Sequence, residues 1–72
     1  MFMKDIEFSK LKIGAEFFIL DTQASRTGYA QYRKLIKLPL VSTGSLEWNA
    51  FSLTAKELKF FKESDKVMFD AG

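Results

Sequence analysis

The sequence predicts a small, mainly β domain of about five strands. Apolar residues make up 47% of the 72 residues and aromatic residues 15%, a globular composition with enough apolar side chains to build a core. These residues occur in short runs, the longest of which is Phe17–Leu20, and polar or glycine-containing segments separate the runs. A chain of this length is predicted to fold as one domain over residues 1–72, with a stability limited by its small core.

The first predicted feature is one turn of helix followed by a glycine. Phe8 and Leu11 lie three residues apart, so one helical turn would direct both side chains into the core. Gly14 interrupts any longer helix, and its expected role is a positive φ angle or a close approach of two backbones. Residues 1–6, before this turn, are expected to form a frayed start or a short edge strand.

The segment Ala15–Asp21 is the most clearly predicted strand. Side chains alternate along a strand, so Phe17 and Ile19 are expected on one face. Phe18 and Leu20 are then expected on the opposite face. In a sheet with one solvated face, apolar residues alternate with polar ones, whereas here both faces are apolar. The pattern therefore predicts either that two layers enclose the strand or that a partner covers one of its faces.

The segment Tyr29–Leu38 has two interpretations. Its aromatic and β-branched residues favour a half-buried strand, whereas Tyr29, Tyr32 and Ile36 recur at helical spacing. Pro39 disfavours a helix at the residue before it, so we prefer the strand. Loops are expected on both sides, at residues 22–28 and 39–45, because these stretches are rich in polar and turn-forming residues.

One segment of the C-terminal half could form either a helix or a hairpin. Strands are predicted at Glu47–Thr54 and Lys66–Phe69, where apolar residues alternate. Between them, Thr54 and Glu57 have the spacing of a helix capping box, which predicts a short C-terminal helix over Ala55–Glu63. Alternatively, the four residues Thr54–Glu57 form a hairpin turn, and Leu58–Phe61 is the returning strand.

The residue inventory argues against catalysis. The chain has no His and no Cys, so the most common bases and nucleophiles, disulfides and the usual zinc sites are all excluded. The four glycines form neither a phosphate-binding loop nor a dinucleotide fingerprint, and the nine acidic residues are too scattered for a calcium loop. We therefore expect a protein that is not an enzyme and that uses no metal and no cofactor.

Charge and hydropathy bear on partners and location. The formal net charge is +2, from eleven basic and nine acidic residues, which permits nucleic-acid binding without predicting it. No apolar run approaches the ~20 residues that a membrane span needs, and the first residues lack the apolar region of a signal peptide. We expect no membrane partner and a cytoplasmic location.

The first functional hypothesis is an apolar surface for a protein partner. Phe18 and Leu20 form the second apolar face of their strand, and Trp48 and Phe61 are further large apolar side chains that could anchor a contact. This hypothesis predicts a non-catalytic interaction module that binds another protein or a second copy of the chain. For Trp48, a position in the core is the alternative.

The second hypothesis is weak nucleic-acid binding. Basic and aromatic residues cluster in the loop and strand after residue 21, and small β-barrels bind single strands by aromatic stacking beside a basic groove. The residues concerned are Arg26, Tyr29, Arg33, Lys34 and Lys37. We prefer the simpler structural interpretation, in which Tyr32 belongs to the core and the cations lie at a solvated rim.

A series of short motifs spans most of the chain. The positions are Phe8, Leu11, Gly14, Phe17, Tyr32, Arg33, Lys34, Asn49, Ala50, Phe60 or Phe61, and Val67. In this order they resemble a family of small bacterial and phage-encoded proteins with an SH3-like β-barrel. The resemblance implies an SH3-like or partly open barrel, a hairpin at residue 55 and a phage or mobile-element origin, but no activity. The chain departs from the family at the last hairpin, where Ala55 and Lys56 replace the usual glycine.

Overall fold

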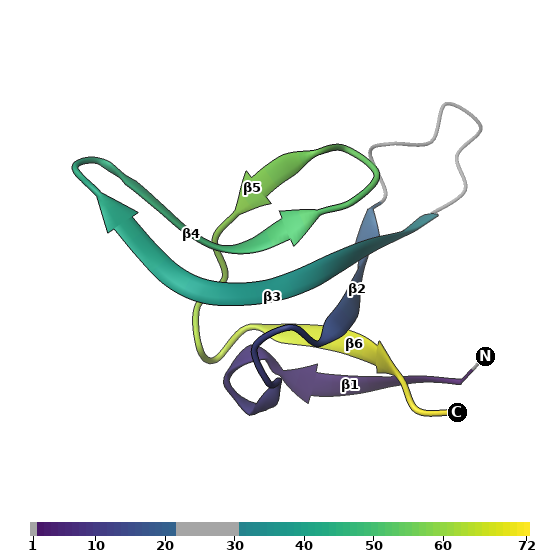
Figure 1. The fold of residues 1–72 in the computed structure, drawn as a ribbon. Helices are drawn as coiled ribbons and strands as arrows, with labels where there is room; N and C mark the ends of the chain where they lie inside the picture. The colour runs from purple at the N-terminus through teal and green to yellow at the C-terminus, as the bar shows by residue number, and fades with distance from the viewer. Residues whose placement is uncertain (1, 22–30) are drawn as a thin grey trace.

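The computed structural model describes residues 2–21 and 31–72, which form six strands and one 3₁₀ turn (Figure 1). The strands are β1 (Met3–Glu7), β2 (Glu16–Asp21), β3 (Gln31–Thr43), β4 (Leu46–Ser52), β5 (Glu57–Lys59) and β6 (Lys66–Asp70). They form one sheet in the order β1-β6-β2-β3-β4-β5, and each strand runs antiparallel to its neighbours. The prediction of a mainly β fold is therefore confirmed.

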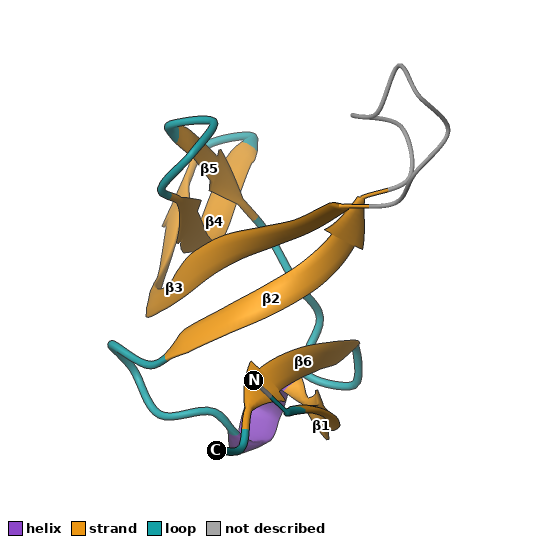
Figure 2. Ribbon diagram, turned by 90° about the vertical axis from the view of Figure 1, so that its right-hand side faces the viewer, coloured by secondary structure: helices purple, strands orange, loops and turns teal. Residues whose placement is uncertain are grey.

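The sheet is open rather than closed into a barrel. Figure 2 shows β4 and β5 at one end of the molecule and β1 and β6 at the other, with β2 and β3 between them. Among the described strands, β1 and β5 end the order and do not pair with each other. β2 joins β6 through a single residue pair, Phe18 opposite Met68. The structure thus differs from the predicted barrel of about five strands, because the N-terminal segment adds a sixth strand and the two edges stay apart.

Three phenylalanines form the centre of the core. The rings of Phe8 and Phe17 meet edge to face with centroids 5.5 Å apart. Phe61 stacks on Phe8 at 5.3 Å and meets Phe17 edge-on at the same distance. Aromatic pairs of these geometries contribute about 0.5–1.5 kcal/mol each beyond the area that they bury. Among the described residues, the other buried apolar side chains of the core are Leu35, Ala50 and Val67.

The turn before β2 follows the sequence prediction. The 3₁₀ turn Phe8–Lys10 buries Phe8 completely, and Leu11 packs against the core. Gly14 has a φ angle of 90°, a conformation that residues with a Cβ rarely adopt. Its N–H donates to the carbonyl oxygen of Lys37 at 2.7 Å, so the backbones of the turn and of β3 approach closely here. The expected positive φ angle is therefore confirmed, whereas a Cβ at this position would meet no atom within 4 Å, so no close approach requires the glycine.

β3 is longer than the sequence predicted. It continues through Pro39 to Thr43, and the chain turns only at residues 44 and 45, so the predicted loop at 39–45 is wrong. The register with β4 jumps between Lys37 and Val41, which places Pro39 in an irregular stretch of the pairing. Proline has no N–H to donate to a ladder, and it is tolerated there because the regular pairing is interrupted at this position. The loop predicted at 22–28 lies outside the described residues.

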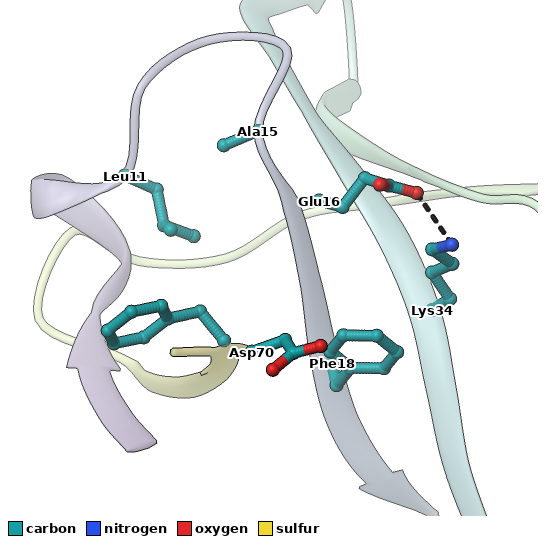
Figure 3. Close-up of a pocket in the computed structure, with 7 residues that line it drawn as sticks. Leu11, Ala15, Glu16, Phe18, Lys34 and Asp70 are labelled. Carbon is teal, nitrogen blue, oxygen red and sulfur yellow. Dashed lines mark ion pairs between the residues drawn. The ribbon is translucent and has the colours of Figure 1, made fainter. Parts of the chain in front are cut away.

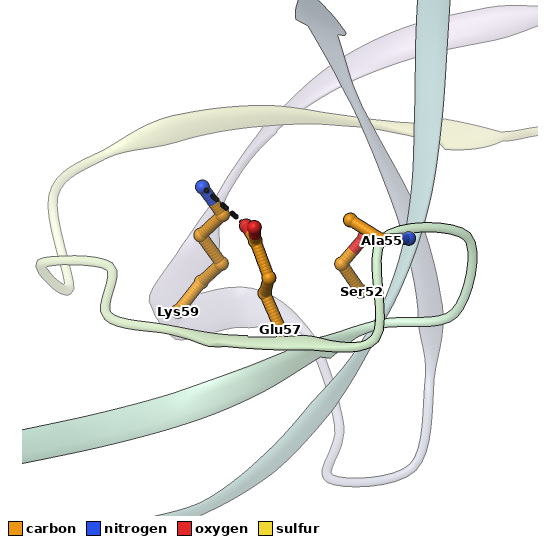
Figure 4. Close-up of polar contacts among 4 residues, drawn as sticks. All are labelled: Ser52, Ala55, Glu57 and Lys59. Carbon is orange, nitrogen blue, oxygen red and sulfur yellow. Dashed lines mark hydrogen bonds and ion pairs between the residues drawn. The ribbon is translucent and has the colours of Figure 1, made fainter.

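The segment after β4 is a hairpin, so of the two alternatives the hairpin is confirmed and the C-terminal helix over Ala55–Glu63 is wrong. Residues 53–56 form a turn, and β5 returns along β4 with Leu58 opposite Phe51. The N–H of Ala55 donates to Ser52 Oγ at 3.3 Å, and Figure 4 shows these two residues at the turn. Lys56 has a φ angle of 54°, the left-handed conformation that a glycine would usually supply. Pairing with β4 has thus overridden the local capping signal.

Asn49 attaches the chain after β5 to β4. Its side-chain Nδ2 donates to the carbonyl oxygen of Phe61 at 2.8 Å, and its Oδ1 accepts from the N–H of Phe61 at 2.9 Å. The amide therefore makes the same two-bond contact that a backbone peptide would make in an antiparallel pair. Asn49 is only 4% exposed, and it holds Phe61 against the core.

Candidate functional site

One face of the central strands carries apolar side chains that the core does not cover. We call Phe18, Leu20, Tyr32 and Lys34 the outer face. Phe17 and Ile19 point into the core, so Phe18 and Leu20 point away from it, as the sequence predicted. Cross-strand pairing places Tyr32 opposite Leu20 and Lys34 opposite Phe18, which puts all four side chains on one side of the sheet. Leu20 is 49% exposed and Tyr32 is 53% exposed.

A pocket opens beside Phe18. It has a volume of about 400 Å³ and lies between β2, β3, β6 and the segment before β2. Its lining residues are Leu11, Ala15, Glu16, Phe18, Lys34, Phe69 and Asp70. Figure 3 shows Leu11, Ala15 and Phe18 around the opening, with Glu16 and Lys34 joined at one side. The volume lies at the lower end of the range of about 300–1,000 Å³ that is typical of ligand sites.

The pocket carries three charged groups around its apolar lining. Lys34 Nζ lies 2.8 Å from Glu16 Oε2, but both side chains are about half exposed, and such surface pairs contribute little to stability. Asp70 adds a second carboxylate. The formal charge of the pocket is therefore −1, although the whole chain carries +2.

Asp70 accepts hydrogen bonds that favour its ionised form. Its Oδ1 accepts from the N–H of Gly72 at 3.0 Å and from the N–H of Phe2 at 3.4 Å. The hydrogen bond from Gly72, followed by the one from Phe2, holds the pKa of the Asp70 carboxyl below its ordinary value of 3.8. Both bonds join the end of β6 to residues near the ends of the chain.

We expect these bonds to make stability depend on pH in the acid range. Because the folded-state pKa of Asp70 is lowered, its contribution to the stability of the fold is complete above pH 3.8. That contribution is lost as the pH falls through the folded-state pKa. The Asp70→Asn variant should therefore be less stable than the wild type at neutral pH, and the difference should shrink on acidification. Urea unfolding of both proteins across this pH range checks the prediction, which a constant difference would contradict.

The structure separates the other two residues of the protein-binding hypothesis from the outer face. Phe61 packs against Phe8 and Phe17, so it is a core residue. Trp48 is half-buried on β4 and lies opposite Val41. Of the four residues predicted from the sequence, the outer face therefore includes Phe18 and Leu20.

The residues of the nucleic-acid hypothesis do not form one surface in the part of the chain that the structure describes. Arg26 and Tyr29 lie outside it. Arg33 is half-buried opposite Ile19 on the core side of β3, whereas Lys34 lies on the outer face beside Glu16. Lys37 is buried.

On β3, the core contains Lys37, which was not expected there, and not Tyr32, which was. The Nζ of Lys37 donates to the carbonyl oxygens of Phe8 and Leu11, both at 2.8 Å, and lies 4.4 Å from the centroid of the Phe8 ring. The predicted rim position of Lys37 and core position of Tyr32 are therefore wrong. Leu35 occupies the core side of β3, and alternation turns Tyr32 outward and Lys37 inward.

Five of the seven pocket residues were missed from the sequence. They are Leu11, Ala15, Glu16, Phe69 and Asp70. The last two belong to β6, which reaches the pocket because β6 pairs with β2 at Phe18. No local pattern signals that pairing. Within residues 2–21 and 31–72, no three acidic side chains gather as a metal site would require. In the same residues, no helix has the length and apolar character needed to cross a bilayer.

The basis for a functional assignment is thus a pocket with an apolar lining, two carboxylates and one lysine beside an exposed apolar face. A ligand of such a surface would have to match both its apolar and its charged parts. No protein-family model matches the chain, and no curated protein and no solved structure matches it either.

Proposed function

We propose that this protein is a non-catalytic binding module that takes an extended segment of a partner protein on its outer face. The observation that carries the proposal is Phe18, which lines the pocket while Leu20 and Tyr32 stay about half exposed beside it. Exposed apolar side chains that gather around a pocket are typical of contact sites, in which one buried anchor supplies much of the affinity. The anchor that fits here is a single large apolar side chain.

The charges of the pocket favour a basic residue next to that anchor. Glu16 and Lys34 compensate each other at 2.8 Å, which leaves the exposed carboxylate of Asp70 as the net charge. A carboxylate repels phosphate and attracts lysine or arginine. The same observation favours a protein ligand over a nucleic acid at this surface.

The proposal is tested with a display library of linear peptides selected on the immobilised protein. We expect the selected peptides to share an apolar residue with a basic residue nearby. Replacing Phe18 with Ser should weaken their binding about tenfold or more, because the apolar side chain of the peptide would lose its contact with the Phe18 ring. Asp70→Asn should weaken only the peptides that carry the basic residue. Fluorescence anisotropy of labelled peptides measures both effects.

Leu40→Ser is the matched control for Phe18→Ser. Leu40 is 61% exposed on β3, outside the pocket, so this variant makes the same change of polarity elsewhere. It should leave peptide binding unchanged, and circular dichroism checks that each variant is folded. Selection of no peptides, or equal binding by the folded Phe18→Ser variant, would contradict the proposal.

A relationship with the small bacterial and phage-encoded proteins remains part of the proposal. It rests on the order of the shared motif residues along the sequence, among them Phe8, Phe17 and Ala50. An SH3-like origin of the open sheet, a cytoplasmic location and a phage-encoded role in binding a host protein would follow from that relationship.

A further inference from the structure

β5 is an edge strand, and no described strand pairs with its free edge. It is the last strand in the order of the sheet, and its only neighbour among the described strands is β4. Its three residues are Glu57, Leu58 and Lys59, and the central Leu58 is 51% exposed. An edge strand of this kind presents backbone N–H and C=O groups to which another strand can add.

We propose that β5 pairs with β5 of a second copy of this chain, in an antiparallel register centred on Leu58. Two-fold symmetry then places Leu58 opposite its own counterpart and each Glu57 opposite Lys59 of the other copy. The contact contains this opposite-charge pair twice, and opposite charges directly across a pair of strands are favourable. The inference does not rest on the peptide-binding role of the outer face.

Charge selects this register over its neighbours. The two adjacent registers that keep the same faces on the same side are centred on Glu57 and on Lys59. Each of them places a charged residue opposite its own counterpart, and like charges directly opposite destabilise a strand pair. Figure 4 shows that Glu57 and Lys59 extend side by side from β5, with 3.5 Å between Glu57 Oε2 and Lys59 Nζ. Both therefore lie on one face of the sheet. In the antiparallel second copy the two charges run in the reverse order, so each faces its opposite.

The other edge of the sheet opposes the same kind of pairing. β1 is also paired on one side only among the described strands. Two-fold pairing centred on Lys4, Asp5 or Glu7 places identical charges opposite each other. Centring on Ile6 places Asp5 opposite Glu7 twice, and centring on Met3 pairs no other residue of β1 with β1 of the second copy. Of the two edges, β5 is therefore the self-complementary one.

The apolar side chains of β5 add to the contact. Leu58 lies opposite Phe51, which in turn lies opposite Ile36. These three side chains form a row on the same side of the sheet as the outer face. Pairing of two β5 strands joins the rows of the two copies through Leu58. A contact of three residues per strand is smaller than a standard interface, so we expect a weak dimer, with a Kd between about 10 μM and about 1 mM.

Sedimentation velocity over this concentration range tests the proposal. The wild type should change from monomer to dimer as the concentration rises. Glu57→Lys and Lys59→Glu should each weaken self-association about tenfold or more, because each variant opposes like charges at both pairs. Mixing the two variants should restore association, since one presents only positive and the other only negative side chains. The double variant Glu57→Lys/Lys59→Glu should dimerise like the wild type.

Controls with matched charge changes lie on β1. Asp5→Lys and Lys4→Glu alter the net charge by the same amounts as the two β5 variants but should leave dimerisation unchanged. Phe18→Ser should also dimerise normally, which separates this inference from the peptide-binding proposal. A wild type that stays monomeric at about 1 mM would overturn the inference. A dimer that persists in the single β5 variants, or a variant mixture that stays monomeric, would also overturn it.

Discussion

Replacing Lys37 with Met is expected to lower the free energy of unfolding by about 2–4 kcal/mol. The Lys37 ammonium donates to the carbonyl oxygens of Phe8 and Leu11, and the change would leave both acceptors without this donor. Hydrogen bonds to charged groups contribute about 1.5–3 kcal/mol each, and water can replace part of the Leu11 bond because that site is only partly buried. Met keeps the apolar stem, so packing alone would change little.

This loss is large for so small a domain. At about 0.05–0.15 kcal/mol per residue, a chain of 72 residues is expected to have a total stability of about 4–11 kcal/mol. Urea unfolding followed by Trp48 fluorescence measures the change. Lys34→Met is the matched control, since Lys34 is on the same strand but forms an exposed pair with Glu16. It should cost less than about 1 kcal/mol, and an equal effect of the two variants would refute the structural role of Lys37.

The second large effect is expected for Asn49→Leu, at about 2–4 kcal/mol. The side chain of Asn49 satisfies both the N–H and the C=O of Phe61, and Leu would leave both groups without a partner. An unsatisfied buried group costs about 1–3 kcal/mol, and in addition Phe61 would lose the contact that holds its ring against Phe8.

Urea unfolding measures this effect as well, and near-ultraviolet circular dichroism reports whether the aromatic core loosens. Ser52→Ala is the control, because Ser52 is equally buried but has one longer contact, 3.3 Å from the N–H of Ala55. It should cost about 1 kcal/mol. A similar cost for the two variants would show that the paired hydrogen bonds of Asn49 have no special weight.

Much of the fold could be predicted from the sequence where local patterns decide the structure. Alternation fixed the two faces of β2, so the core position of Phe17 and the outward position of Phe18 followed directly. The glycine conformation before β2 followed from the break in the apolar pattern. The helix predicted after residue 54 shows the limit of such reasoning, because pairing of β5 with β4 outweighs a capping box.

The candidate site was predictable only in part. Phe18 and Leu20 were found because an apolar residue on both faces of a strand is visible in the sequence. Asp70 was not, because it reaches the pocket through the pairing of β6 with β2, which no short-range signal encodes. The burial of Lys37 was hidden for a similar reason, since its hydrogen-bond acceptors are backbone carbonyls brought to it by the fold.

The pairing of β1 with β6 has a consequence for the order in which the chain folds. β3, β4 and β5 follow one another as hairpins with short turns, so their contacts close small loops. β1 instead pairs with the most distant strand, with Met3 opposite Asp70. Contacts so far apart along the chain form slowly, because the entropy of closing the long loop is lost before the contact contributes. We therefore expect the hairpins to form first and the β1–β6 pair, with the pocket beside it, to form last.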